Sequence, residues 1–100
     1  MTRTYNNIEQ QFISRGIVKS NMLFLDRATA IEFAKMVRLQ NGKLLGFDGF
    51  FLTENSTQPS MEHSRDYSSS STDGVDEAID FLSNPELDDM FFEMVTSIDE

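Results

Sequence analysis

The chain has no cysteine and no tryptophan, and it has only one histidine and two prolines among its 100 residues. Without cysteine it has no disulfide, no thiol nucleophile and no cysteine-ligated zinc. No apolar run approaches the ~20 residues of a membrane-spanning helix, and the first residues contain no apolar signal-peptide core. We therefore expect one small soluble domain, residues 1–100, in the cytoplasm.

Basic residues are also scarce, above all in the second half. The chain carries 8 Lys and Arg against 17 Asp and Glu, a net charge of −9. Residues 1–50 contain seven basic and four acidic side chains, whereas residues 51–100 contain one and thirteen. The basic residues lie singly and form no patch typical of nucleic-acid binding. So acidic a half repels nucleic acid and membranes and attracts basic proteins, but it is equally typical of a solubilising surface.

Motifs for catalysis and metal binding are absent as well. Ser64, His63 and Asp66 contain the side chains of a nucleophilic triad, but no G-x-S-x-G elbow or evident oxyanion hole accompanies them. Glu62, His63 and Asp66 match no spacing of metal ligands. Counted from Asp73, an EF-hand loop requires an oxygen donor at the third place and a glycine at the sixth. This chain has Val75 and Ala78 at these two places. We therefore expect no enzyme activity, no cofactor and no metal.

Local patterns predict the elements of the first half. Residues 5–15 predict a short helix, and the apolar run at residues 22–25 predicts a buried strand. Asp26 is placed as the N-cap of a helix over residues 27–40, which Asn41-Gly42 closes. The apolar stripe of this second helix consists of Ala30, Phe33, Ala34 and Val37.

The segment KLLGFDGFFLTE, residues 43–54, predicts extended structure. Asp48-Gly49 inside it is typical of a type I′ hairpin turn, and the alternative is one bent strand with a bulge at Gly49. Both alternatives give a strand–helix–strand spine, in which parallel strands need a right-handed crossover. The expected fold is α+β, a single small domain with a short sheet packed by helices.

The remaining chain predicts a flexible serine-rich loop at residues 68–74 and two acidic C-terminal helices. Asn84 and Pro85 are the expected start of the second helix. Phe81 and Phe92 lie off the two apolar stripes, either at the edge of the core or as exposed anchors for a partner. The stripes consist of Val75, Ala78, Ile79 and Leu82, and of Leu87, Met90, Phe91, Met94, Val95 and Ile98.

By elimination, the acidic half is best interpreted as a recognition surface, framed by the loop between Thr53 and Gly74. The candidate partner-binding residues are Glu54, Glu62, Asp66, Tyr67, Asp73, Asp76, Glu77, Asp80, Phe81, Asp88, Asp89, Phe92 and Glu93.

The segment TAIEFAKMVRLQNGKLLGFDGFFLTENSTQPSMEHSRDYSS, residues 29–69, resembles small immunity proteins of bacterial toxin–immunity pairs. These include the immunity proteins of polymorphic-toxin and contact-dependent growth inhibition systems. The resemblance implies a cytoplasmic protein without catalytic activity that binds one cognate toxin domain as a heterodimer and blocks it. Many such toxins are basic nucleases, and carboxylates can replace phosphate oxygens in front of their Lys and Arg side chains.

Three other hypotheses stay open at this point. In the first, the protein is an acidic nucleic-acid mimic of the phage anti-defence kind that blocks a DNA-binding protein. In the second, it is an adaptor whose C-terminal segment ELDDMFFEMVTSIDE docks into a partner as an amphipathic helix. In the third, it is a small enzyme or metal protein centred on Glu62, His63 and Asp66.

Overall fold

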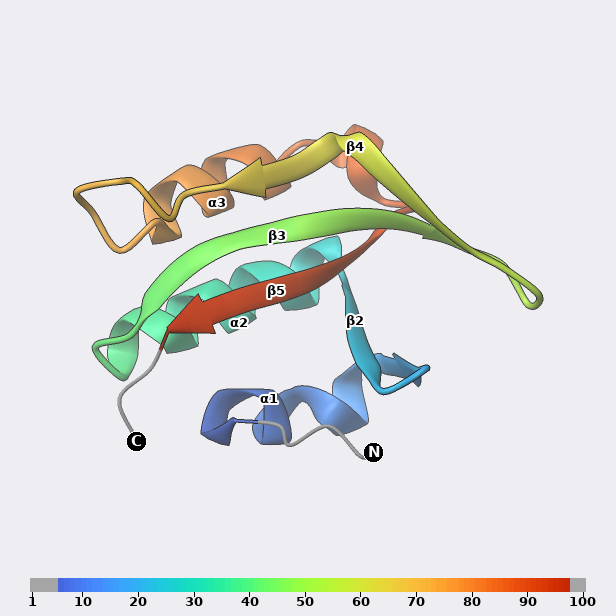
Figure 1. Ribbon diagram of the computed structural model, residues 1–100, viewed down its shortest axis with the longest axis horizontal. Coiled ribbons are helices and arrows are strands. Elements are labelled where there is room, and N and C mark those ends of the chain that lie inside the picture. The colour runs from blue at the N-terminus through green and yellow to red at the C-terminus, as the bar shows by residue number, and fades with distance from the viewer. Residues whose placement is uncertain (1–5, 98–100) are drawn as a thin grey trace.

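The computed structural model describes residues 6–97, which form one antiparallel five-stranded sheet and three α-helices (Figure 1). Across the sheet the strand order is β1-β2-β5-β3-β4. The elements are α1 (Asn7–Phe12), η1 (Ile13–Arg15, a 3₁₀ turn), β1 (Ile17–Lys19), β2 (Met22–Asp26), α2 (Arg27–Leu39), β3 (Lys43–Leu52), β4 (Thr57–Asp66), α3 (Val75–Leu82), η2 (Pro85–Leu87, a 3₁₀ turn) and β5 (Phe91–Ser97). The expected small α+β domain is confirmed at this level.

Side-chain caps start the first two helices. The Asn6 side chain accepts from the Glu9 backbone N–H at 2.8 Å, and the Glu9 carboxylate accepts from the Asn6 backbone N–H at 3.1 Å. This reciprocal pair is a capping box. Asp26 caps α2 as predicted, because its Oδ1 accepts from the Thr29 backbone N–H at 2.8 Å. The predicted stripe of α2 is buried throughout. Tyr5, the first residue of the predicted first helix, lies outside the described residues.

The predicted hairpin turn at Asp48-Gly49 is wrong, because β3 runs without interruption from Lys43 to Leu52. The chain turns later, at residues 53–56, where the Thr53 N–H donates to the Ser56 carbonyl at 3.0 Å. A β-bulge is present, but its extra residues belong to β4. Phe47 pairs with Arg65 and Gly49 with Ser60, so one residue on β3 faces four on β4, residues 61–64.

Gly49 has a role in this bulge that differs from the predicted one. A Cβ added at Gly49 would lie 2.8 Å from the carbonyl oxygen of His63. Because Cβ atoms do not approach carbonyl oxygens so closely, only glycine lets the bulged segment of β4 pack against β3 at this point.

The strand–helix–strand order is present in β2, α2 and β3, but it does not form the expected spine. β5 lies between β2 and β3 and is antiparallel to both. The two strands that flank α2 therefore run parallel without being neighbours. The central strand of the sheet comes from the C-terminal end of the chain.

The prediction of a second acidic C-terminal helix is wrong. Asn84 caps a turn as predicted, because its side chain accepts from the Glu86 N–H at 3.1 Å, but this turn is the 3₁₀ turn η2 and ends at Leu87. Residues from Phe91 onward then form β5, with Phe92 and Met94 buried and Val95 exposed. This alternation has the period of a strand. Ile98, the last residue of the predicted stripe, lies outside the described residues.

The main core lies between the sheet and helices α2 and α3, which stand behind the sheet in Figure 1. Phe47 lies at its centre, with ring centroids of Tyr67, Phe81 and Phe92 at 6.1, 5.5 and 5.4 Å. On the opposite face of the sheet, the Phe24 and Phe50 rings pack edge to face at 5.0 Å. Aromatic pairs in this geometry add to the stabilisation that burial alone provides.

Lys19 joins two distant turns of the sheet. Its Nζ donates to the carbonyl oxygens of Thr53 at 3.1 Å and Ser56 at 3.2 Å. The turn between β1 and β2 is thereby tied to the turn between β3 and β4. Phe24 on β2 and Phe50 on β3 are 1% and 8% exposed.

Candidate interaction surface

Most of the predicted acidic residues lie in one continuous part of the chain, residues 73–89, which we call the acidic segment. It contains α3 and η2 and has no Lys, Arg or His. α3 buries Val75, Ala78 and Leu82 against the core, so its carboxylates face solvent. The carboxylates of the acidic segment belong to Asp73, Asp76, Glu77, Asp80, Glu86, Asp88 and Asp89.

Two arginines of α2, Arg27 and Arg38, form ion pairs with three of these carboxylates. Arg38 donates from Nε and Nη2 to the two carboxylate oxygens of Asp73, at 2.9 and 3.0 Å, and from Nη1 to Asp76 at 3.0 Å. This hydrogen bonding lowers the pKa of Asp73 and raises the pKa of Arg38. Arg27 donates from Nε to Asp88 at 2.7 Å. Two arginines from the basic first half of the chain therefore offset part of the negative charge of the second half.

Four carboxylates of the acidic segment stay exposed and form no ion pair with any residue that the structure describes. Glu77 accepts one hydrogen bond, from the Thr72 hydroxyl at 2.9 Å. The four belong to Glu77, Asp80, Glu86 and Asp89. No described basic residue pairs with these four carboxylates of the acidic segment.

The three predicted aromatic anchors differ in exposure. Phe92 is fully buried under the sheet, so it is a core residue and no part of a surface. Phe81 is half-buried, and the Arg65 guanidinium lies over its ring, 4.2 Å from the centroid. Tyr67 is half-buried beside Phe47, and this burial raises its pKa. Of the three, Phe81 is the one that lies within the acidic segment and is only half-buried.

The other candidates lie elsewhere. Glu54 is in the turn between β3 and β4, and Glu62 is in the bulge of β4. Asp66 and Glu93 lie on the face of the sheet that is opposite helices α2 and α3. Asp66 accepts from the Ser68 N–H at 2.8 Å, and hydrogen bonding to Ser68 lowers its pKa. The thirteen predicted residues therefore do not form one surface.

The serine-rich loop is held by β3. Lys43 Nζ donates to the carbonyl oxygens of Ser68 and Ser70, both at 3.1 Å. The Leu44 N–H donates to the Asp73 carbonyl at 2.7 Å. These bonds place the last part of the predicted framing loop next to α3, whereas its first part, near Glu54, belongs to the β3–β4 turn.

The serine and histidine side chains of β4 do not form the triad that the sequence permitted. His63 Nδ1 lies 2.7 Å from Ser60 Oγ. Ser64 Oγ donates to the Ser60 carbonyl at 2.9 Å and accepts from the Gly49 N–H at 3.1 Å. These contacts hold the bulge against β3. Asp66 bonds to Ser68 instead of His63.

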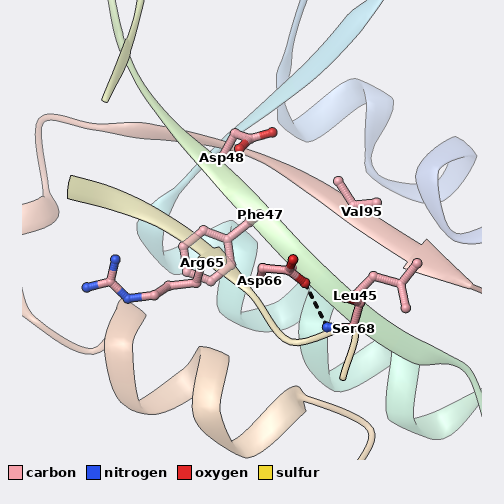
Figure 2. A pocket seen from close by; sticks show the side chains of 8 residues that line it. Leu45, Phe47, Asp48, Arg65, Asp66, Ser68 and Val95 are labelled. Carbon is pink, nitrogen blue, oxygen red and sulfur yellow. Dashed lines mark hydrogen bonds between the residues drawn. The ribbon is translucent and has the colours of Figure 1, made fainter. Parts of the chain in front are cut away.

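A hollow on the open face of the sheet was missed by the sequence reasoning. Its volume is about 340 Å³, and Leu45, Asp48, Asp66 and Val95 lie around it (Figure 2). Asp48 was not among the predicted site residues. The signal that could have identified it is the strand pattern of residues 43–52, in which an acidic side chain alternates with buried ones.

The sequence matches no protein-family model and no curated protein. Between residues 6 and 97, no helix has the length and apolar character needed to span a membrane.

Proposed function

We propose that the protein is an immunity protein that binds a basic toxin domain, of the nuclease kind, through the acidic segment and so neutralises it in the cytoplasm. The observation that carries the proposal is the set of four exposed carboxylates on α3 and around η2 that no basic residue of the described fold pairs with. Arg38 and Arg27 pair with the neighbouring carboxylates, so basic groups are available within the fold, but these four are left for a partner.

The chemistry suits a protein that binds phosphates. A nuclease holds its substrate with Lys and Arg side chains, and carboxylates form charge-assisted hydrogen bonds with the same side chains. The field of the acidic segment also steers a basic protein toward it and raises the association rate. Affinity needs an apolar anchor in addition, and Phe81 is the aromatic residue next to the carboxylates.

The adaptor hypothesis loses its basis in this fold. Its docking element was an amphipathic helix made from the C-terminal segment, but residues 91–97 are the strand between β2 and β3. A segment that completes the sheet is not available to enter a groove of another protein.

Co-purification of the tagged protein with the product of the gene immediately upstream tests the proposal. We expect a stable one-to-one complex with a basic domain. The double variant Glu77→Gln/Asp80→Asn should weaken this complex, whereas Ser83→Ala, at the C-cap of the same helix, should not. Absence of any complex with a neighbouring gene product or a basic nuclease domain would contradict the proposal. Broad competition with DNA for host DNA-binding proteins would favour the nucleic-acid mimic.

A further inference from the structure

The register of three strands creates the hollow on the open face of the sheet. Gly46 on β3 pairs with Val95 on β5 and with Asp66 on β4. Paired residues present their side chains on the same face. The middle position of this row has no side chain, so Val95 and Asp66 stand on either side of a gap.

The gap cannot be filled by a larger residue at position 46. Gly46 has φ of 153°, a conformation that side chains disfavour. A Cβ added there would lie 2.3 Å from the carbonyl oxygen of Arg65. The β3 backbone at Gly46 therefore requires glycine, and the hollow follows from that requirement.

Carboxylates border the hollow. Asp48 lies directly opposite Glu93 in the next row of the same face, and Asp66 lies on the β4 side. Hydrogen bonding to Ser68 lowers the pKa of Asp66 and so favours its ionised form (Figure 2).

Arg65 lines the hollow but does not neutralise it. Its Nη1 donates to the carbonyl oxygens of Glu62 at 2.9 Å and Ser64 at 2.8 Å. Figure 2 shows its guanidinium pointing away from Asp48 and Asp66, toward the side where it covers the Phe81 ring. The Arg65 cation is engaged over the Phe81 ring, and neither Asp48 nor Asp66 forms an ion pair with a described basic residue.

The floor of the hollow is apolar. Leu45 is half-buried, and Val95 is 42% exposed on the same open face. A Lys or Arg side chain matches an apolar floor with an acidic border, because its apolar stem carries a cationic end. A metal ion is a poorer match, because the described residues contain no group of three His, Asp or Glu side chains able to hold one.

We propose that this hollow docks an extended basic segment of the partner protein, which places one Arg or Lys side chain over Leu45 and Val95 with its charge against Asp48 and Asp66. Charge complementarity selects the occupant. The inference rests on the proposed function only in taking the partner to be a basic protein. It adds a second contact site, on the face of the sheet opposite α3.

The test uses a defined probe, the peptide acetyl-Gly-Arg-Thr-Arg-Gly-amide, titrated into the ¹⁵N-labelled protein and followed by NMR. We expect saturable shifts at the backbone amides of Leu45, Gly46, Ser68 and Val95. The same peptide with citrulline in place of arginine keeps the shape without the charge and should give no saturable shift.

Two double variants with the same change in net charge separate the sites. Asp48→Asn/Asp66→Asn should weaken binding of the arginine peptide about tenfold. Glu77→Gln/Asp80→Asn on α3 should leave its binding within about twofold of wild type, because α3 lies on the other side of the sheet. The amide introduced by Asp66→Asn keeps an oxygen acceptor for the Ser68 N–H, so the first variant should fold, and its amide spectrum verifies this.

A third variant fills the hollow from within. Val95→Lys places a cation beside Asp48 and Asp66 and should abolish the peptide-induced shifts. Shifts confined to residues 73–89, equal weakening by both double variants, or no saturable shift in the wild-type protein would each overturn the inference.

The outcomes also separate this inference from the proposed function. If a toxin complex forms and only Glu77→Gln/Asp80→Asn weakens it, the proposed immunity function is supported and docking at the hollow is contradicted. If no toxin domain is captured but the arginine peptide maps to the hollow, docking at the hollow is supported and the immunity function is contradicted.

Discussion

Arg38 and Asp73 form a two-pronged contact between α2 and the residues that lead into α3, with N–O distances of 2.9 and 3.0 Å. Asp73 Oδ1 also accepts from the Val75 N–H at 3.0 Å, at the first turn of α3. One carboxylate therefore binds the first backbone N–H of α3 and ties this helix to α2. The contact joins the basic first half of the chain to its acidic second half.

Replacing Asp73 with Asn should flatten the acid limb of the stability profile. Arg38 lowers the pKa of Asp73 in the folded state, so the unfolded chain binds more protons at acid pH. The pair therefore stabilises the wild-type fold above the ordinary pKa of 3.8, and this stabilisation is lost as pH falls through the lowered folded value. Urea unfolding between about pH 6 and pH 2.5 measures the slope.

A matched control for this profile is Asp89→Asn. Asp89 is exposed and forms no ion pair with a described residue, so its replacement should keep the wild-type slope. Parallel profiles for wild type and Asp73→Asn would show that the contact with Arg38 does not govern acid stability.

Phe92 and Phe81 should respond differently to truncation. Phe92→Ala removes a fully buried ring beside Phe47 and should lower the free energy of unfolding by about 3–5 kcal/mol. Phe81→Ala removes a half-buried ring and should cost about 1–2 kcal/mol. Urea denaturation measures both values. Equal costs would mean that Phe81 is as much a core residue as Phe92.

Elements whose signals are local could be predicted from the sequence. The Asp26 cap and the stripe that contains Phe33 depend on residues three or four positions apart, and both are present. Long-range contacts could not be predicted in this way. Arg38 and Asp73 are 35 positions apart, and nothing in the neighbourhood of either residue indicates the other.

The segment that became β5 shows why the last helix was wrong. Met90 and Met94 are four positions apart and fit a helical stripe, but with Phe92 they also fit the alternation of a strand. Both patterns bury the two methionines. Pairing with β2 and β3 decides between them, and that pairing is tertiary. The predicted hairpin turn at Asp48-Gly49 was wrong for the same reason, since pairing with β5 continues through both residues.

Deletion of residues 85–100 should unfold the protein. β5 supplies the backbone partners of β2 and β3, and its loss would leave both strands with an unpaired edge in the middle of the sheet. We expect the dispersion of the amide NMR spectrum to collapse. The point variant Val95→Thr on the exposed face of the same strand should keep a folded spectrum. A folded truncated chain would restore the hypothesis of a separable C-terminal docking segment.

His63→Ala should leave partner binding unchanged and lower the free energy of unfolding by about 1 kcal/mol, the usual contribution of one hydrogen bond. Its described role is to contact Ser60 and hold the β4 bulge. Ser60→Ala removes the same contact and should have a similar effect on stability. Binding to the captured toxin domain and urea denaturation provide the two measurements. Loss of function without loss of stability would favour the hypothesis of an active site at His63.

Binding of the basic partner should weaken steeply as salt concentration rises. The Debye length falls from about 10 Å at 0.1 M to about 3 Å at 1 M, so the field of the exposed carboxylates is screened before it reaches the partner. The effect should appear mainly in the association rate, because steering acts before contact. Stopped-flow association at a series of NaCl concentrations measures it. Glu77→Gln/Asp80→Asn should flatten the dependence, since these carboxylates have no ion-pair partner in the described fold. An association rate that does not change with salt would mean that the interface is apolar and that the acidic segment serves solubility.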